Sequence, residues 1–187
     1  MAYQTARGAT PGKTRKTHAN STGAGRQPLY TPAERARRDS TRWTLVQGIL
    51  APVQFLVFLV SLVLVVRYLT GGEGLAIATA SVVLKTLVLY AIMITGAIWE
   101  KVVFGRYLFA PAFFWEDVFS MLVLALHTAY LACVFLGLLD GRGQMLLALA
   151  AYATYVVNAA QFILKLRAAR LERPTSVAGE PLAEGAA

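Results

Sequence analysis

The sequence has little from which to build a disulfide framework or a metal centre of its own. Its 187 residues include one cysteine, Cys133, and two histidines, of which His18 lies near the N-terminus. One cysteine can form neither an intrachain disulfide nor a Cys-X-X-Cys metal site, and two histidines exclude a multi-histidine site. Glycine-rich nucleotide loops and the HExxH and GxSxG signatures are also absent. The sequence therefore offers no motif of a soluble enzyme.

Charged residues are scarce as well, at 15% of the chain against 57% hydrophobic residues. A soluble domain of this length carries more charge and is less apolar. The charges are also segregated, because most Lys and Arg lie outside or between four apolar stretches that run from Trp43 to Arg167. The formal net charge of +8 is therefore typical of basic flanks on membrane segments, and nucleic-acid binding is not expected.

Each apolar stretch is close to the ~20 residues with which a helix crosses ~30 Å of hydrocarbon. Backbone groups in lipid must be hydrogen-bonded within their own segment, so helix is the expected state of each stretch. The sequence predicts an all-α polytopic membrane protein, a bundle of four transmembrane helices over about 43–68, 75–99, 115–139 and 144–166. Glycine-rich turn signals at 71–74 and 140–143 separate the spans within each half.

The transmembrane domain is expected to occupy residues 41–172, between two polar tails. Residues 1–40 and 173–187 contain few large apolar side chains, so they bury too little surface to offset the chain entropy of folding. Both tails are predicted to be disordered, although residues 31–42 can also form a short basic helix on the membrane surface. The first apolar run starts beyond residue 40 and is too long for a secretory signal.

Four spans place both termini on one side of the membrane. The basic residues concentrate on that side, in the two terminal flanks and in the connection between the second and third spans. They include Arg35, Arg37, Arg38, Arg42, Lys101, Arg106, Lys165, Arg167, Arg170 and Arg173. The positive-inside rule therefore predicts that both termini are cytoplasmic.

Four polar residues are expected near the middle of the bilayer: Gln54, Lys85, His127 and Asn158. An ionisable group at this depth is costly, so Lys85 and His127 are candidate substrate-binding residues, with the two amides beside them. The alternative is that such residues only form hydrogen bonds between helices. Lys165, near the end of the fourth span, is expected to snorkel to the surface.

A second group of polar residues lies at the cytoplasmic edge. Glu100 closes the second span, Arg106 lies in the connection, and Glu116 and Asp117 open the third span after Trp115. The helix dipole alone favours acidic residues in a first turn. Carboxylates among aromatic side chains are nevertheless typical of a site for a flat apolar ligand with a polar edge.

Three blocks of the sequence resemble one known family. They are WTLVQGILAPVQFLVFLVSLVLVVRYL (43–69), GAIWEKVVFGRYLFAPAFFWEDVFSMLVLALHTAYLACVFLGLL (96–139) and AAYATYVVNAAQFILKLRAARL (150–171). In these blocks, and over roughly residues 38–172, the chain resembles the vinyl bacteriochlorophyllide hydratases of bacteriochlorophyll synthesis. The N-terminal tail lies outside the resemblance.

The resemblance implies a hydro-lyase that adds water to the C3-vinyl group of chlorophyllide a or 3-vinyl bacteriochlorophyllide a. The product carries a 3-(1-hydroxyethyl) group. The resemblance also implies a bacterial inner or photosynthetic membrane, with other bacteriochlorophyll-synthesis enzymes and further copies of the chain as candidate partners. No cofactor is expected, because hydration is not a redox reaction and the pigment carries its own magnesium.

Hydration of an alkene needs a proton donor, a water molecule and a base. Glu116, Asp117 and Glu100 are the candidate catalytic residues, because a carboxylic acid in an apolar site can donate a proton at neutral pH. Glu116 is the first choice, since it shares a helix face with Ser120 and His127. His127 is interpreted as an axial ligand of the pigment magnesium, with proton transfer as the alternative. Arg106 or Lys101 can pair with the pigment propionate.

Two other functions fit the same residues. A non-enzymatic tetrapyrrole carrier or assembly factor would use the aromatic residues and His127 but would need no acid. A small transporter would use the polar layer at the middle of the bundle, and with four spans it would have to oligomerise. A carrier would bind pigment without converting it and would not need the carboxyl groups, which distinguishes it from an enzyme. A transporter would lose uptake when Lys85 is removed.

Overall fold

The computed structural model describes residues 29–171, which fold into five helices with no strand among them. The helices are α1 (Pro32–Ser40), α2 (Arg42–Gly71), α3 (Leu75–Phe104), α4 (Phe114–Leu136) and α5 (Gly141–Leu171). The helices α2 to α5 are long and apolar enough to cross a membrane. The all-α fold with four spans is therefore confirmed. The predicted tail 173–187 and residues 1–28 of the N-terminal tail lie outside the described residues.

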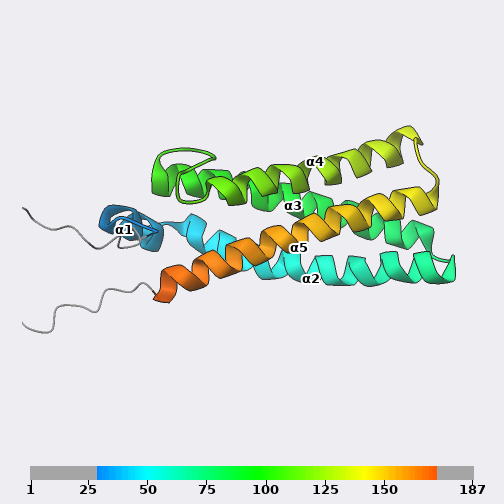
Figure 1. Ribbon diagram of the computed structural model, residues 1–187, viewed down its shortest axis with the longest axis horizontal. Coiled ribbons are helices and arrows are strands. Elements are labelled where there is room, and N and C mark those ends of the chain that lie inside the picture. The colour runs from blue at the N-terminus through cyan, green and yellow to red at the C-terminus, as the bar shows by residue number, and fades with distance from the viewer. Residues whose placement is uncertain (1–28, 172–187) are drawn as a thin grey trace, which may run out of the picture.

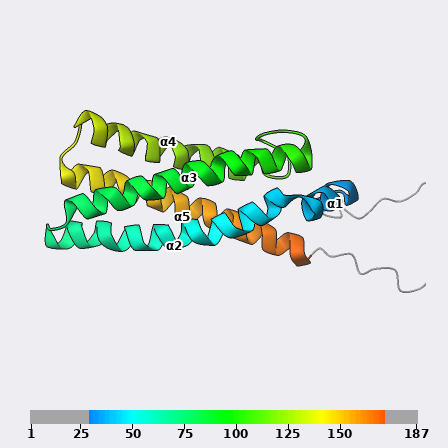
Figure 2. The same cartoon turned by 180° about the vertical axis from the view of Figure 1, so that it is seen from behind.

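The long helices form an elongated bundle of two antiparallel hairpins, α2–α3 and α4–α5 (Figures 1 and 2). Residues 29 and 171, where the described chain begins and stops, lie at the same end of this bundle as α1 and the 105–113 connection. We call this the α1 end. The opposite end holds the two short turns, which include left-handed glycines at Gly72 and Gly137.

The structure has a capped helix at α1, the short basic helix that was the alternative to a disordered tail for residues 31–42. The Thr31 hydroxyl accepts a hydrogen bond from the Glu34 backbone N–H, and Glu34 Oε2 accepts one from the Thr31 N–H at 2.8 Å. Arg37 Nε then donates to the Val103 carbonyl at 2.8 Å and attaches α1 to α3. The Tyr30 ring stacks on Phe104, and burial raises the pKa of its hydroxyl. The reciprocal hydrogen bonds between Thr31 and Glu34 form a capping box, which fixes the start of α1.

The outer faces of the four long helices are apolar, and several large side chains there are exposed. Leu56 is 62% exposed on α2, Ile94 is 63% exposed on α3, and Phe135 is 77% exposed on α4. Lipid, rather than other parts of the chain, would cover such faces. Their positions leave the polar residues of each span to face the interior of the bundle.

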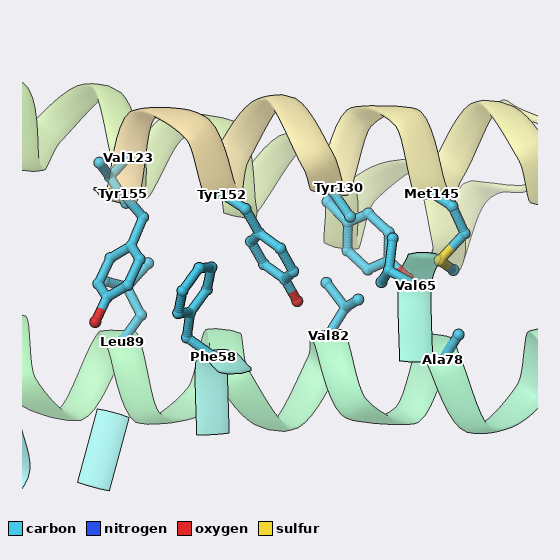
Figure 3. Close-up of a cluster of buried hydrophobic side chains, with 11 residues drawn as sticks. Phe58, Val65, Ala78, Val82, Leu89, Val123, Tyr130, Met145, Tyr152 and Tyr155 are labelled. Atoms are coloured by element: carbon cyan, nitrogen blue, oxygen red, sulfur yellow. The ribbon is translucent and has the colours of Figure 1, made fainter. Parts of the chain in front are cut away.

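The core of the bundle is a line of aromatic and aliphatic side chains contributed by all four long helices (Figure 3). Phe58 of α2 packs between Tyr152 and Tyr155 of α5, with ring centroids 5.3 and 4.9 Å away. Val82 and Leu89 approach this group from α3. The aromatic residues fill the space where the two hairpins meet. Buried polar side chains interrupt this core near the middle of the bundle and near the α1 end.

Candidate active site at the α1 end of the bundle

Buried polar side chains form two groups in the bundle, one near its middle and one at the α1 end. The middle group is centred on Lys85 and His127, both fully buried. Lys85 Nζ lies 2.7 Å from His127 Nε2, and His127 Nδ1 lies 2.8 Å from the Val123 carbonyl. A carbonyl only accepts, so Nδ1 carries the ring proton and Nε2 accepts from Lys85. Lys85 Nζ also lies over the Tyr155 ring, at 4.1 Å from its centroid.

This arrangement argues against the predicted role of His127 as a ligand of the pigment magnesium. Both ring nitrogens are occupied and the side chain has no exposed surface. Metal ligation through Nε2 would require Lys85 to leave and the hairpins to part. The interpretation that fits is a hydrogen bond between helices α3 and α4, the alternative already set out for these residues.

Among the other buried polar residues of α2, Ser61 forms hydrogen bonds between helices and, within the described residues, Gln54 does not. Ser61 of α2 bonds to Ser81 of α3 at 2.7 Å and to the Tyr152 hydroxyl of α5 at 2.6 Å. Gln54 is buried, and its Oε1 has no donor among residues 29–171. The structure places Gln54 and Lys85 inside the bundle, where neither is available to a ligand at the surface.

The second group contains the three predicted carboxyl groups, but they do not share one environment. Glu100 in the last turns of α3 and Asp117 in the first turn of α4 are each 5% exposed, and their carboxyl groups are neighbours. The Phe109 N–H donates to Asp117 Oδ2 at 2.7 Å. Two buried carboxyl groups side by side repel each other when both are ionised, so this arrangement favours one proton shared between them. The Glu100–Asp117 pair is therefore a candidate proton donor.

Glu116, the first choice from sequence, instead forms an ion pair. Its Oε2 lies 2.6 Å from Lys165 Nζ of α5, and the lysine also lies over the Phe113 ring at 5.1 Å. The carboxylate of an ion pair has no proton to give, so this geometry favours Glu100 and Asp117 over Glu116 as the acid. Lys165, expected to snorkel to the surface, has a side chain 26% exposed and also has a partner, Glu116, that the sequence did not predict.

Asn158 joins the same group from α5, where it is 9% exposed. Its Nδ2 donates to Ser120 Oγ of α4 at 2.9 Å. Sequence reasoning placed Asn158 at the middle of the membrane with Gln54, whereas its partner Ser120 is one helical turn from Glu116. Lys165 was the functional candidate that sequence reasoning missed, and its spacing from Asn158 on one face of α5 was the available signal.

Aromatic residues surround the carboxyl groups on two sides. Phe113 is buried and packs against Trp99, Phe104 and Phe162, with ring centroids 5.8 to 5.9 Å apart. A different set is exposed on the 105–113 connection and the start of α4, and consists of Tyr107, Phe109, Phe114 and Trp115. Arg106 and Lys101 are exposed beside them. We call this second set the exposed aromatic patch.

Phe109 links the exposed aromatic patch to the acid pair through its backbone. Its φ is 60°, in the left-handed region, where it is the one non-glycine among the described residues. Such a conformation costs about 1–3 kcal/mol and persists only when the surroundings impose it. Here it directs the Phe109 N–H to Asp117, while the ring lies 5.8 Å from that of Phe114. The strained backbone of Phe109 therefore provides the N–H group that holds Asp117 in place.

One surface hollow of about 190 Å³ lies between α2 and α3. Small-molecule pockets usually measure about 300–1,000 Å³, so this hollow is small for a tetrapyrrole. Its lining is Leu56, Val57, Val60, Ser81 and Leu84, which includes none of the acidic residues. This hollow therefore gives no access to the acid pair.

Comparison with known proteins gives consistent matches. The 2-vinyl bacteriochlorophyllide hydratase family matches residues 30–168. The 2-vinyl bacteriochlorophyllide hydratase of Rhodobacter capsulatus is 68% identical over 154 residues, which cover 82% of this chain and 90% of that protein. The protein of the same name from Cereibacter sphaeroides is 68% identical over 152 residues, 81% of this chain and 94% of that protein. No solved structure matches.

Proposed function

The chain belongs to the 2-vinyl bacteriochlorophyllide hydratase family, and we propose that it adds water to the vinyl group of a chlorophyllide or bacteriochlorophyllide. The resemblance noted in the sequence is confirmed, and the chain is a membrane-bound hydro-lyase of bacteriochlorophyll synthesis. C2-vinyl and C3-vinyl denote the same substituent under the two numbering schemes of the macrocycle. The proposed product is the 1-hydroxyethyl pigment. The 68% identity across nearly all of both relatives is the observation that carries this proposal.

The proposed acid is the Glu100–Asp117 pair. Its proton passes to the terminal vinyl carbon and leaves positive charge on the inner carbon, where the conjugated macrocycle delocalises it. The oxygen of a water molecule then forms the new C–O bond, and a base takes the extra proton. Asp117, relieved of the shared proton, is one such base, and Glu116 contributes negative charge that stabilises the cation. No nucleotide or reductant enters this balance, so none is proposed as a cofactor.

The exposed aromatic patch is the proposed docking surface for the macrocycle. One of its residues, Phe109, donates its backbone N–H to Asp117 of the acid pair. A flat apolar ring gains stacking area on Phe109, Phe114 and Trp115, while Arg106 at the surface can pair with the propionate. The vinyl edge would then face the acid pair from the lipid side of α3 and α4.

The α1 end is proposed to face the cytoplasm. The basic residues of α1, of the 105–113 connection and of the last turns of α5 all lie at this end, as the positive-inside rule requires. A reporter that is active only in the periplasm, fused after residue 72 and after residue 171, tests this. Activity of the first fusion and inactivity of the second is the expected pattern. Partner enzymes that supply and consume the pigment would approach laterally in the same membrane.

The activity test supplies membranes that contain the protein with chlorophyllide a, without nucleotide or reductant. We expect the pigment to gain the mass of one water, and its absorption to shift to the blue as the vinyl conjugation is lost. Pigment that binds without a change of mass to a protein shown to be folded would refute the hydratase proposal. That outcome would favour the carrier function.

A further inference from the structure

Two buried amide oxygens on one face of α5 have no hydrogen-bond donor among residues 29–171. They are Asn158 Oδ1 and Gln161 Oε1. In native proteins buried polar atoms are almost always paired, with protein groups or with bound small molecules. Two orphaned oxygens on one helix face therefore indicate a place where another molecule supplies the hydrogen-bond donors.

The face of α5 that carries these two amides is held against α4 by two defined contacts. Asn158 is fixed to α4 by its bond to Ser120, and Lys165 is fixed to α4 by its ion pair with Glu116. Gln161 lies three residues after Asn158 and four before Lys165, so it shares their face of α5. Gln161 therefore lies on the face of α5 that contacts α4 between Glu116 and Ser120. Asp117, one member of the acid pair, belongs to this stretch.

Ser120 completes the arrangement because it has a proton left to donate. Its Oγ accepts from Asn158 Nδ2, and this is its one side-chain hydrogen bond within the described residues. Ser120 is 3% exposed, so its hydroxyl proton also needs a buried partner. The site thus combines one free donor, the Ser120 hydroxyl, with two free acceptors, the amide oxygens. A water molecule, with two donors and two acceptor positions, satisfies all three.

We propose that Ser120, Asn158 and Gln161 hold the water molecule that is added to the vinyl group. This inference rests on the proposed hydratase function. In the balanced step, the acid pair protonates the terminal carbon, the held water forms a bond to the inner carbon, and its surplus proton returns to the acid pair. The three residues are positioning residues, since they touch the water and not the macrocycle. The two amide oxygens accept hydrogen bonds from the protons of the water, which directs a lone pair of its oxygen towards the cation.

The first test compares Asn158→Ala with Gln47→Ala in the same membranes. Gln47 is a matched control, because its Nε2 also donates to a hydroxyl of a neighbouring helix, Thr95 Oγ1, at 2.8 Å. Misplacing a reactant costs about 10²-fold in rate, so we expect kcat of Asn158→Ala to fall about 10²-fold at unchanged KM for the pigment. Gln47→Ala should keep kcat and KM for the pigment.

A small alcohol gives a readout that a merely structural role would not change. Removing the Asn158 carboxamide leaves room for methanol, whose oxygen can bond to the inner carbon as its hydroxyl proton leaves. Asn158→Ala in dilute methanol should therefore form the methyl ether, and the wild type should form only the alcohol. A wild-type rate in Asn158→Ala, or an equal ratio of ether to alcohol in Asn158→Ala, Gln47→Ala and wild type, would overturn the inference.

The second test does not depend on turnover. An experimental density map of the substrate-free protein should show an ordered water within hydrogen-bonding distance of Asn158 Oδ1 and Gln161 Oε1. Side chains that close directly on these oxygens, with no water between them, would overturn the inference. A protein with this water that leaves the vinyl pigment unchanged would keep the water site and refute the hydratase function, so the two failures can be told apart.

Discussion

The Glu100→Gln substitution separates the acid favoured by the structure from the one favoured by the sequence. Glutamine has nearly the same shape as glutamate, and its amide N–H can donate to Asp117, so the contact between α3 and α4 is kept. The proton that the pair shares is lost. General acid catalysis contributes about 10²–10⁴-fold to rate. At 1.36 kcal/mol per tenfold, this corresponds to about 2.7–5.4 kcal/mol of the activation barrier.

We therefore expect kcat of Glu100→Gln to fall by at least about 10²-fold, with little change in thermal stability in detergent. Single-turnover formation of the hydroxyethyl pigment, followed by mass, measures this directly. Glu116→Gln is the comparison. It breaks the ion pair with Lys165, so it should lower stability by about 1–3 kcal/mol and reduce kcat less than Glu100→Gln does. Wild-type kcat in Glu100→Gln, together with an inactive but folded Glu116→Gln, would return the acid role to Glu116.

Three further predictions concern the supporting contacts. Lys85→Met should lower the free energy of unfolding by about 1–3 kcal/mol, because His127 Nε2 loses its buried donor. Adding His127→Leu should recover much of this loss. Additive losses of the two substitutions in thermal unfolding would contradict the Lys85–His127 hydrogen bond. Lys165→Met should destabilise the protein through the unpaired Glu116, whereas Lys165→Arg should not, and equal melting temperatures of the two variants would refute this. Phe109→Gly should keep kcat, because glycine adopts the φ of 60° without strain and keeps the N–H that binds Asp117, while KM for the pigment rises as the exposed aromatic patch loses a ring. Phe109→Pro removes that N–H and cannot adopt a φ of 60°, so kcat should fall at least about tenfold as Asp117 loses a charge-assisted hydrogen bond. Similar kcat values in the two Phe109 variants would separate the loop from catalysis.

The sequence alone predicts the architecture of this protein because a bilayer imposes strong constraints on composition. Four apolar stretches of suitable length must be helices, and the glycine-rich signals between them mark the turns. The periodicity of polar residues also shows which face of each helix lies inside. The long blocks shared with vinyl bacteriochlorophyllide hydratases add the family, which the 68% identical relatives confirm. Glu100, Glu116 and Asp117 stand out in the sequence as three carboxyl groups near one membrane surface.

Only the tertiary structure decides which of these polar residues are partners. Periodicity fixes the face of a helix but not the axial offset between neighbouring helices, and a shift of one turn exchanges every contact. The offset between α4 and α5 pairs Lys165 with Glu116, although the position of the lysine near a helix end predicted a surface role. The offset between α3 and α4 brings His127 within hydrogen-bonding distance of Lys85. The path of the 105–113 connection, with Phe109 in a left-handed conformation, brings Glu100 and Asp117 together. Side chains from different helices meet because of helix packing and loop geometry. The periodicity of polar residues in the sequence specifies neither the packing nor the path of the loops.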